Sequence, residues 1–338
     1  MAESVQEISP FVNIPAAARP VIRPTTREWL RHIALFLVTV VTTTIARLII
    51  AAPEIDIPEP PLAGAIDYLL YIPRVYLDNV FGILFFSFQH PQLLIDGLTF
   101  SAALLSILTA HEMGHYIACR RYRVNATLPY FIPAPPIFLA GTFGAFIKIK
   151  SSIPSRRALF DIGLAGPLAG FVVAIPISIL GILYLQPSTS NVNYSIIFND
   201  PLLFRLLAKL INVPLDPYAP TNPYYMAAWI GILVTSLNLM PVGQLDGGHG
   251  TFAVFGKRVH HVTGRVAFVA TAVLTVLGFW WHGSPSGFLY TVLLGVMLRV
   301  RHPQPGIMEP LGKARLLVGI ITLLVFALCF CPFPITLG

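Results

Sequence analysis

The chain alternates between long apolar runs and short polar or Pro-rich segments. About twenty consecutive apolar residues in a helix cross the hydrocarbon core of a bilayer, so each such run predicts a membrane span. We expect spans at residues 33–52, 93–119, 158–185, 225–240, 265–282, 286–299 and 315–333. Residues 66–89 are apolar but interrupted by Pro73, Arg74 and Asp78, which predicts an interfacial or partly inserted helix, with a full span as the alternative.

One segment between these runs does not have a helical composition. Residues 128–150 contain four prolines, followed by glycine, aromatic and β-branched residues that alternate at the end of the segment. This pattern is typical of a strand or hairpin. The sequence therefore predicts an all-α polytopic membrane protein of about seven or eight transmembrane helices, with a small membrane-embedded β-hairpin or strand around 128–150. A short amphipathic helix is expected near residues 201–211.

Composition supports the membrane assignment. Of the 338 residues, 55% are hydrophobic and 11% are charged, and the mean hydropathy of +0.74 is far above that of ordinary globular chains. Thirty prolines and 25 glycines are tolerated in a membrane where neighbouring helices or a protected cavity satisfy the backbone. Three cysteines, Cys119, Cys329 and Cys331, have neither metal-ligand spacing nor a disulfide framework, so we expect them to serve in packing.

The formal charge of +7 is distributed in a way that argues against nucleic-acid binding, because the basic residues lie at the ends of apolar runs. If the amino terminus is cytoplasmic and the spans alternate, 18 of the 22 Lys and Arg fall on the cytoplasmic side, as the positive-inside rule requires. They comprise four before residue 33, seven within 120–157, three within 257–265 and four within 299–315. We therefore expect a multi-pass protein of a bacterial cytoplasmic membrane, with a cytoplasmic tail over residues 1–32.

The run at 93–119 contains the sequence His111-Glu112-Met113-Gly114-His115. Two helical residues four apart lie about 40° from each other on one face, so both imidazoles can bind one metal ion from the same direction. Glu112 flanks that face and can take a proton from a metal-bound water. A His-Glu-x-x-His sequence arises by chance on the order of once in a few hundred chains of this composition. This disfavours the alternative, a structural pair of helix histidines.

A third ligand is expected from a distant segment, because catalytic zinc takes three protein ligands and keeps one position for water. Four carboxylates lie in or beside apolar runs, where an ionisable group is a functional candidate by default: Asp96, Glu112, Asp161 and Asp246. Asp246 fits best, since we place it at the cytoplasmic end of the 225–240 span, at a depth similar to that of His115. Pro241 and the nearby glycines would let the backbone bend that carboxylate towards the helix motif.

Several histidines and glycines near these two segments also have predicted roles. His249 is an alternative metal ligand, whereas the histidines at span ends, His260, His261, His282 and His302, are expected to be solvated. Gly114 and the Gly166-x-x-x-Gly170 spacing should let helices pack closely beside the site.

The two motifs together resemble the site-2 proteases (peptidase family M50), intramembrane zinc metallopeptidases that cut within or beside a substrate's membrane-spanning segment. The resemblance covers roughly residues 93–260. It rests on the helix motif and on Asn238-x-x-Pro241-x-x-x-Leu245-Asp246-Gly247 downstream. It is nearest to compact bacterial and plastid-type members that carry a Gly-Thr-Phe-Gly-Ala-Phe segment, and an inserted PDZ domain has no room here.

The resemblance implies zinc bound by His111, His115 and Asp246, with Glu112 as the catalytic acid/base. It also implies that Asn238 assists near the site. On a straight helix Asn238 would lie about 12 Å from Asp246, so this role requires unwinding near Pro241. A substrate made extended for cleavage would pair with the strand formed by Gly141, Thr142, Phe143, Gly144, Ala145 and Phe146. An ordinary re-entrant loop is the alternative for this strand.

We therefore expect a catalytic core over residues 91–260, preceded by a first span and interfacial segment over 33–90 and followed by carboxyl-terminal spans over 261–338. Its partners would be the lipid bilayer and a transmembrane protein substrate, cut near the cytoplasmic face. A metal transporter or metal-stabilised scaffold is the alternative, and it would spread its ligands along a crossing path. A prenyl-protein type of protease would need a downstream glutamate ligand, which no apolar run offers.

Overall fold

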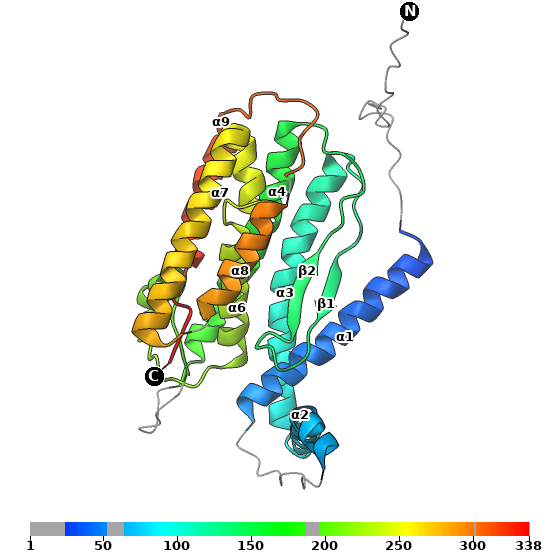
Figure 1. Cartoon of the computed structure of the whole chain (residues 1–338), viewed down its shortest axis with the longest axis vertical. Helices are drawn as coiled ribbons and strands as arrows, with labels where there is room; N and C mark the ends of the chain where they lie inside the picture. Colours follow the sequence, from blue (N-terminus) through cyan, green and yellow to red (C-terminus); the bar gives the residue numbers. More distant parts are fainter. Residues whose placement is uncertain (1–23, 53–63, 187–195, 285, 301, 338) are drawn as a thin grey trace, which may run out of the picture.

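The computed structural model describes residues 24–52, 64–186, 196–284, 286–300 and 302–337 (Figure 1). Most of the expected tail, residues 1–23, lies outside this part. The described residues form nine helices and two small sheets in this order: α1 (Thr26–Ala51), α2 (Ala65–Gln89), α3 (Pro91–Arg121), β1 (Tyr130–Pro133), β2 (Thr142–Phe146), α4 (Arg156–Leu183), β3 (Ile196–Phe198), α5 (Leu202–Leu210), α6 (Pro223–Asn238), α7 (Asp246–His282), α8 (Ser286–Arg299), α9 (Lys313–Cys329) and β4 (Ile335–Leu337).

Five helices are long and apolar enough to cross a membrane, which supports the expectation of a helical membrane protein. They are α1, residues 69–89 of α2, α3, α4 and α7. Helices α6, α8 and α9 are apolar but have only 16, 14 and 17 residues. The expected total of seven or eight spans therefore stays a prediction. The short amphipathic helix expected near 201–211 is present as α5.

The centre of the bundle is built from α3, α4 and α6. Most of α6 is buried, including Met226, Trp229 and Ile232, since other elements cover it on all sides. Helices α3 and α4 approach closely, as expected from their glycines. A Cβ on Gly114 would collide with the backbone of α4, and one on Gly166 would collide with the imidazole of a histidine on α3.

Helix α1 crosses α3 in the antiparallel sense along the edge of the bundle (Figure 1). Its start is fixed by a capping box, in which Thr25 and Glu28 satisfy each other's backbone N–H groups. Its buried face carries Arg47, whose Nε donates to the Asp96 carboxylate of α3 at 2.6 Å. Asp96 is thus neutralised by a partner within the bundle.

Strands β1 and β2 pair antiparallel between α1 and α3, with β1 beside α1 and β2 beside α3 (Figure 1). Tyr130 lies opposite Phe146 and Phe131 opposite Ala145, and the register then shifts before Pro133. The irregularity coincides with Gly144, whose φ of +96° belongs to the region that glycine favours. The second sheet, β3 with β4, is also antiparallel. The position of the β1–β2 hairpin in a membrane stays a prediction.

The segment around Asp246 differs from the sequence-based expectation. Asp246 does not end the helix that contains residues 225–240 but is the first residue of α7, which begins well before the expected start at 265. Helix α6 stops at Asn238, and a turn follows. Gly243 in that turn has a φ of +54° and lies against the backbone of α8, while Pro241 cannot donate a helical hydrogen bond. Helix α7 itself kinks at Gly256.

Candidate metal centre

Three candidate ligands converge from two helices. His111 and His115 lie on successive turns of α3, and Asp246 opens α7 opposite them. One Asp246 carboxylate oxygen lies 3.2 Å from Nε2 of His111 and 3.4 Å from Nε2 of His115, and the two Nε2 atoms are 3.2 Å apart. Each imidazole is more than nine-tenths buried. Segments more than 130 residues apart in the chain thus meet at one point.

The donor atoms fit a zinc ion. Zinc binds imidazole nitrogen and carboxylate oxygen at about 2.0–2.2 Å, so tetrahedral neighbours are about 3.3 Å apart. The three separations here agree with that spacing, and neutral imidazole with carboxylate is a donor set that zinc favours in hydrolases. Among the described residues, this is the one group of three or more His, Cys, Asp or Glu that could hold a metal ion.

The orientation of His115 is fixed from behind by α4. Its Nδ1 lies 2.7 Å from the carbonyl oxygen of Ile162, which can only accept, so Nδ1 carries the proton and Nε2 keeps a lone pair facing Asp246. Gly166, one turn further along α4, leaves the space that the imidazole occupies. Because metal-binding histidines are usually held in this way by a backbone carbonyl or carboxylate, the α4 contact suits a ligand.

Glu112 lies beside the three candidate ligands and is not one of them. Its carboxylate is 3.9 Å from Nε2 of His111, and its side chain is 8% exposed. The backbone of Ile147, the residue after β2, interacts with the same carboxylate. A carboxylate held next to the centre but outside direct ligation is suited to accept a proton from a water bound there.

Asn238 ends α6 and reaches the centre because the chain turns after it. Its Nδ2 lies 3.4 Å from Nε2 of His111, at the outer limit of a hydrogen bond. The unwinding that the sequence required near Pro241 is present in this turn. The side chain therefore lies next to the centre.

A cavity of about 620 Å³ opens beside the centre. Glu112, Asn238 and Asp246 line one part of it, together with both imidazoles of α3. The segment from Ala145 to Ile149, which includes the end of β2, lines another part. Of the six strand residues predicted to meet a substrate, Ala145 and Phe146 reach the cavity, whereas its lining does not include the other four: Gly141, Thr142, Phe143 and Gly144.

The expectation that His260 and His302 are solvated was wrong. His260 is 3% exposed and His302 is partly buried, with their rings 4.8 Å apart. Because α7 starts at Asp246, His260 lies inside this helix and not at a span end. Phe252, on the other side of the Gly256 kink, stacks on the His302 ring with the ring centroids 4.3 Å apart. Helical spacing does not relate Phe252 to His260, because the kink at Gly256 lies between them.

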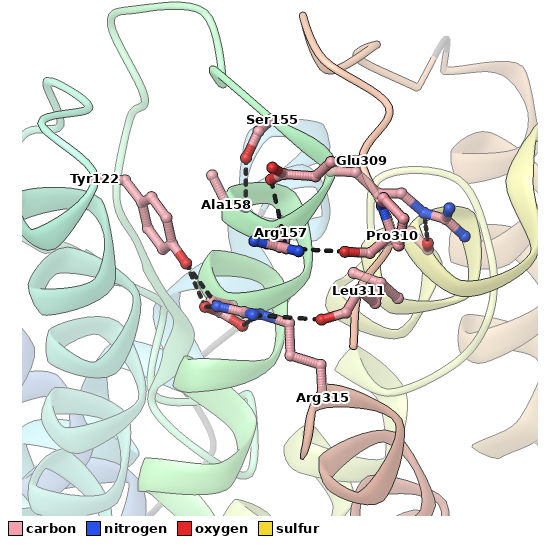
Figure 2. A network of polar contacts seen from close by, with 11 residues as sticks. Tyr122, Ser155, Arg157, Ala158, Glu309, Pro310, Leu311 and Arg315 are labelled. Carbon is pink, nitrogen blue, oxygen red and sulfur yellow. Dashed lines mark hydrogen bonds and ion pairs between the residues drawn. The ribbon is translucent and has the colours of Figure 1, made fainter. Parts of the chain in front are cut away.

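His249, the alternative ligand, does not join the group of three. It lines the cavity, and its Nδ1 lies 2.8 Å from Nε2 of His302. Asp161, another intramembrane candidate, pairs with Arg315 of α9 and accepts from the Tyr122 hydroxyl (Figure 2). Its carboxylate therefore belongs to a closed polar network and not to the cavity.

Comparisons with known proteins agree with this geometry. The chain is 29% identical over 264 residues to the probable zinc metalloprotease EGY2, chloroplastic, of Oryza sativa subsp. indica, covering 74% of this chain and 46% of the relative. The corresponding Arabidopsis thaliana EGY2 protein is 28% identical over 294 residues, 82% of this chain and 50% of the relative. The Arabidopsis EGY1 protein is 31% identical over 239 residues, 68% and 42%.

The chain spans about half the length of these curated relatives. The family model described as "Peptidase family M50" matches residues 99–279, which is more than half of the chain and includes most of α3, all of α4 and α6, and nearly all of α7. The matched region contains all three candidate ligands and Glu112. By this match, the chain belongs to peptidase family M50, as its resemblance to the site-2 proteases predicted.

Proposed function

We propose that this chain is a zinc-dependent intramembrane endopeptidase that hydrolyses peptide bonds in or next to transmembrane segments of membrane-protein substrates. The observation that carries the proposal is the convergence of His111, His115 and Asp246 to within 4.8 Å, with Glu112 beside them in one cavity. Family membership and the metalloprotease names of the relatives support the same reaction class.

The chain's own residues would divide the work as follows. His111, His115 and Asp246 would hold zinc, which when bound polarises a carbonyl and acidifies a water. Glu112 would take the proton of the attacking water and give it to the leaving nitrogen as the peptide bond breaks. Asn238, next to His111, would offer its amide N–H to the polar groups of the reacting peptide.

The substrate would be an unwound transmembrane segment. A peptide must be extended to expose a scissile bond, and the end of β2 lines the cavity with a strand edge that β1 does not use. Pairing with this edge would satisfy backbone N–H and C=O groups that a helix loses when it unwinds in lipid. Ala145 and Phe146 are the strand residues nearest to that role.

The proposed topology has seven crossings, by α1, α3, α4, α6, α7, α8 and α9. The ends of helices that carry the Lys and Arg clusters gather at one end of the bundle, which supports a cytoplasmic or equivalent positive-inside side there (Figure 1). Helix α2 joins the end of α1 to the start of α3 on the opposite side, so a full crossing by α2 would require residues 53–63 to cross too. Those residues include three carboxylates, which favours an interfacial or partly inserted α2.

The orientation of the helices does not identify the cellular membrane in which the protein lies. The relatives are named chloroplastic, and they give no support to the expectation of a bacterial membrane. The proposal is therefore limited to an integral, multi-pass protein with its centre near the positively charged side.

Substitution of Glu112→Gln tests the reaction. The amide keeps the size of the side chain but cannot accept the water's proton. Cleavage of a reconstituted membrane substrate should then fall by at least about a hundredfold, while zinc content stays near that of the unaltered protein. Glu309→Gln, the same change on a surface segment outside the cavity, is the matched control. Undiminished turnover by the Glu112→Gln protein would refute the proposal.

The metal-transporter alternative makes a different prediction. A transporter needs ligand groups along a crossing path, whereas the described residues bring together one such group at one depth. Metal flux across sealed vesicles without any proteolysis would favour the transporter.

A further inference from the structure

The connection between α8 and α9 lies against the cavity. We call residues 302–312 the strap. Its residues Pro303 and Gln304 line the cavity, and its next part runs alongside the start of α4. Ile307 N–H donates to the Pro154 carbonyl at 3.1 Å and the Ile307 carbonyl accepts from Arg156 N–H at 2.8 Å. Backbone bonds thus hold the middle of the strap in place.

Side chains pin the far end of the strap (Figure 2). Arg157 of α4 donates to the Pro310 carbonyl at 2.8 Å and lies 3.8 Å from the Glu309 carboxylate. Arg315, in the first turn of α9 that follows the strap, is bound to Asp161 by two hydrogen bonds of 2.7 and 2.8 Å. The strap is therefore anchored to α4 by side chains as well as along its backbone.

The first residue of the strap forms a hydrogen-bond chain that leads into the cavity. Nδ1 of His302 lies 2.7 Å from the Pro303 carbonyl oxygen, so Nδ1 carries the proton. Burial, with His249 and His260 beside it, lowers the pKa of His302 to about 3, so the ring is neutral and its Nε2 has a lone pair. That lone pair faces Nδ1 of His249 at 2.8 Å, which must therefore donate.

This chain of hydrogen bonds sets the tautomer of His249. With its proton on Nδ1, neutral His249 has a lone pair on Nε2. The His249 side chain lines the cavity, one turn of α7 beyond Asp246. It is not in the group of three ligands. Phe252 stacks on the His302 ring and His260 packs edge-on against it, which holds the ring that orients His249.

A peptide bound in the cavity would bring a backbone N–H that the Nε2 lone pair of His249 could accept. An extended peptide that pairs with β2 along one edge presents N–H and C=O groups along its other edge, on the far side of the cavity. Once a peptide fills the cavity and displaces water from it, an N–H left unpaired would be costly. Since the end of β2 and His249 both line the cavity, a peptide bound along β2 would have His249 beside it.

We propose that His249 is a substrate-binding residue that accepts a hydrogen bond from a backbone N–H of the bound peptide, and that His302 is a positioning residue that acts through His249. The inference rests on the proposed function, because it requires a peptide in the cavity. It assigns the strap a role in recognition, since the strap carries the histidine that fixes His249.

The test uses the full-length protein with Glu112→Gln, so that a transmembrane peptide substrate binds without being cut. His249→Phe should weaken binding about tenfold, which corresponds to about 1.4 kcal/mol. His302→Phe, which keeps an aromatic ring next to Phe252 but cannot accept, should weaken it by a similar factor. The double variant should lose no more than about tenfold, because His302 acts only through His249. His302→Gln, whose amide oxygen can accept, should restore most of the affinity.

A series of peptides locates the hydrogen bond. In each peptide one backbone N–H near the scissile bond is replaced by an ester oxygen. One position should weaken binding to the parent protein about tenfold and have little effect on the His249→Phe protein. In cleaving enzyme the same variant should raise KM with little change in kcat, since the contact is made before and during reaction. Zinc content and thermal unfolding should match the parent in each variant.

The results that would contradict this inference differ from those that would contradict the proposed protease function. Additive losses in the double variant would show that His302 does not act through His249. An ester series that His249→Phe does not alter at any position would show that His249 does not bind the substrate backbone. Because the ester series does not use His302→Phe, it stays decisive even if that variant folds poorly. Continued cleavage by the Glu112→Gln protein would instead remove the proposed function.

Discussion

Two polar clusters within the same bundle differ in how their charges are arranged. In the network of Tyr122, Asp161 and Arg315, each donor meets an acceptor, because the guanidinium contacts both carboxylate oxygens and the phenol (Figure 2). At the metal centre, one Asp246 oxygen and two imidazole nitrogens face one another at 3.2–3.4 Å. Acceptors converge there without enough donors between them, which is the arrangement that a cation completes.

The comparison shows what an intramembrane carboxylate does and does not indicate. Asp96, Asp161 and Asp246 were all functional candidates because an unpaired charge in lipid is costly. Asp96 and Asp161 are each paired with an arginine from another helix, so they join helices. Asp246 is paired with no arginine in the part of the chain that the structure describes. The presence of an arginine partner, and not the degree of burial, distinguishes a carboxylate that joins helices from one that belongs to the metal centre.

The largest expected effect comes from Asp246→Asn. The amide removes the negative charge that holds the third ligand position, so bound zinc should be lost and cleavage should fall to background. Zinc stoichiometry of the purified protein is the measurement. Asp161→Asn is the matched control, since it makes the same change in the closed network and should keep its zinc. Equal zinc loss in both variants would erase the distinction between the clusters.

A smaller effect is expected from Gly166→Ala. The added methyl group would occupy the place of the His115 imidazole and displace it from the Ile162 carbonyl. Because such supporting contacts are typically worth tenfold to a hundredfold, zinc affinity should fall by roughly that factor. Gly319→Ala on α9 is the control, since a Cβ there meets Phe160 only at an ordinary 3.8 Å. A chelator titration of both variants gives the comparison.

We expect Arg315→Met to lower the stability of the fold without changing zinc binding. Removing the guanidinium leaves the Asp161 carboxylate with the Tyr122 hydroxyl as its remaining donor. Both side chains of the ion pair are about 30% exposed, so water reduces the penalty. We expect a loss of about 1–3 kcal/mol in the free energy of unfolding, with zinc content unchanged and cleavage within a few-fold. Thermal unfolding in detergent measures the first quantity. Loss of zinc would mean that the two clusters are coupled.

Much of the site was predictable from the sequence because its features are local. His111 and His115 lie on successive turns of one helix, with Glu112 flanking them, so their proximity follows from helical geometry. Gly114 and Gly166 mark the close contact of α3 with α4, which the structure confirms. The approach of Asp246 to these histidines came from a depth argument, which used only the charges at helix ends.

The parts that could not be predicted depend on where helices start and on loop packing. Hydropathy locates the apolar centre of a span, so the polar first turns of α7 were assigned to a loop, and Asp246 to the wrong helix. The same misplacement put His260 at a span end. His302 lies outside the apolar runs, and nothing local in the sequence indicates that its ring contacts His249. Only the folded strap brings them together.

The smallest expected effect is that of Glu309→Gln on the strap. Its ion pair with Arg157 spans 3.8 Å, and the two side chains are 30% and 42% exposed, so the free energy of unfolding should change by less than about 1 kcal/mol. The strap should stay in place, because Arg157 also donates to the Pro310 carbonyl and Ile307 is held through its backbone. Hydrogen exchange of the strap amides, at low and high salt, measures this directly. Faster exchange of Ile307 in the variant at both salt concentrations would show that this exposed pair holds the strap, and that the difference between closed networks and surface pairs has been overstated.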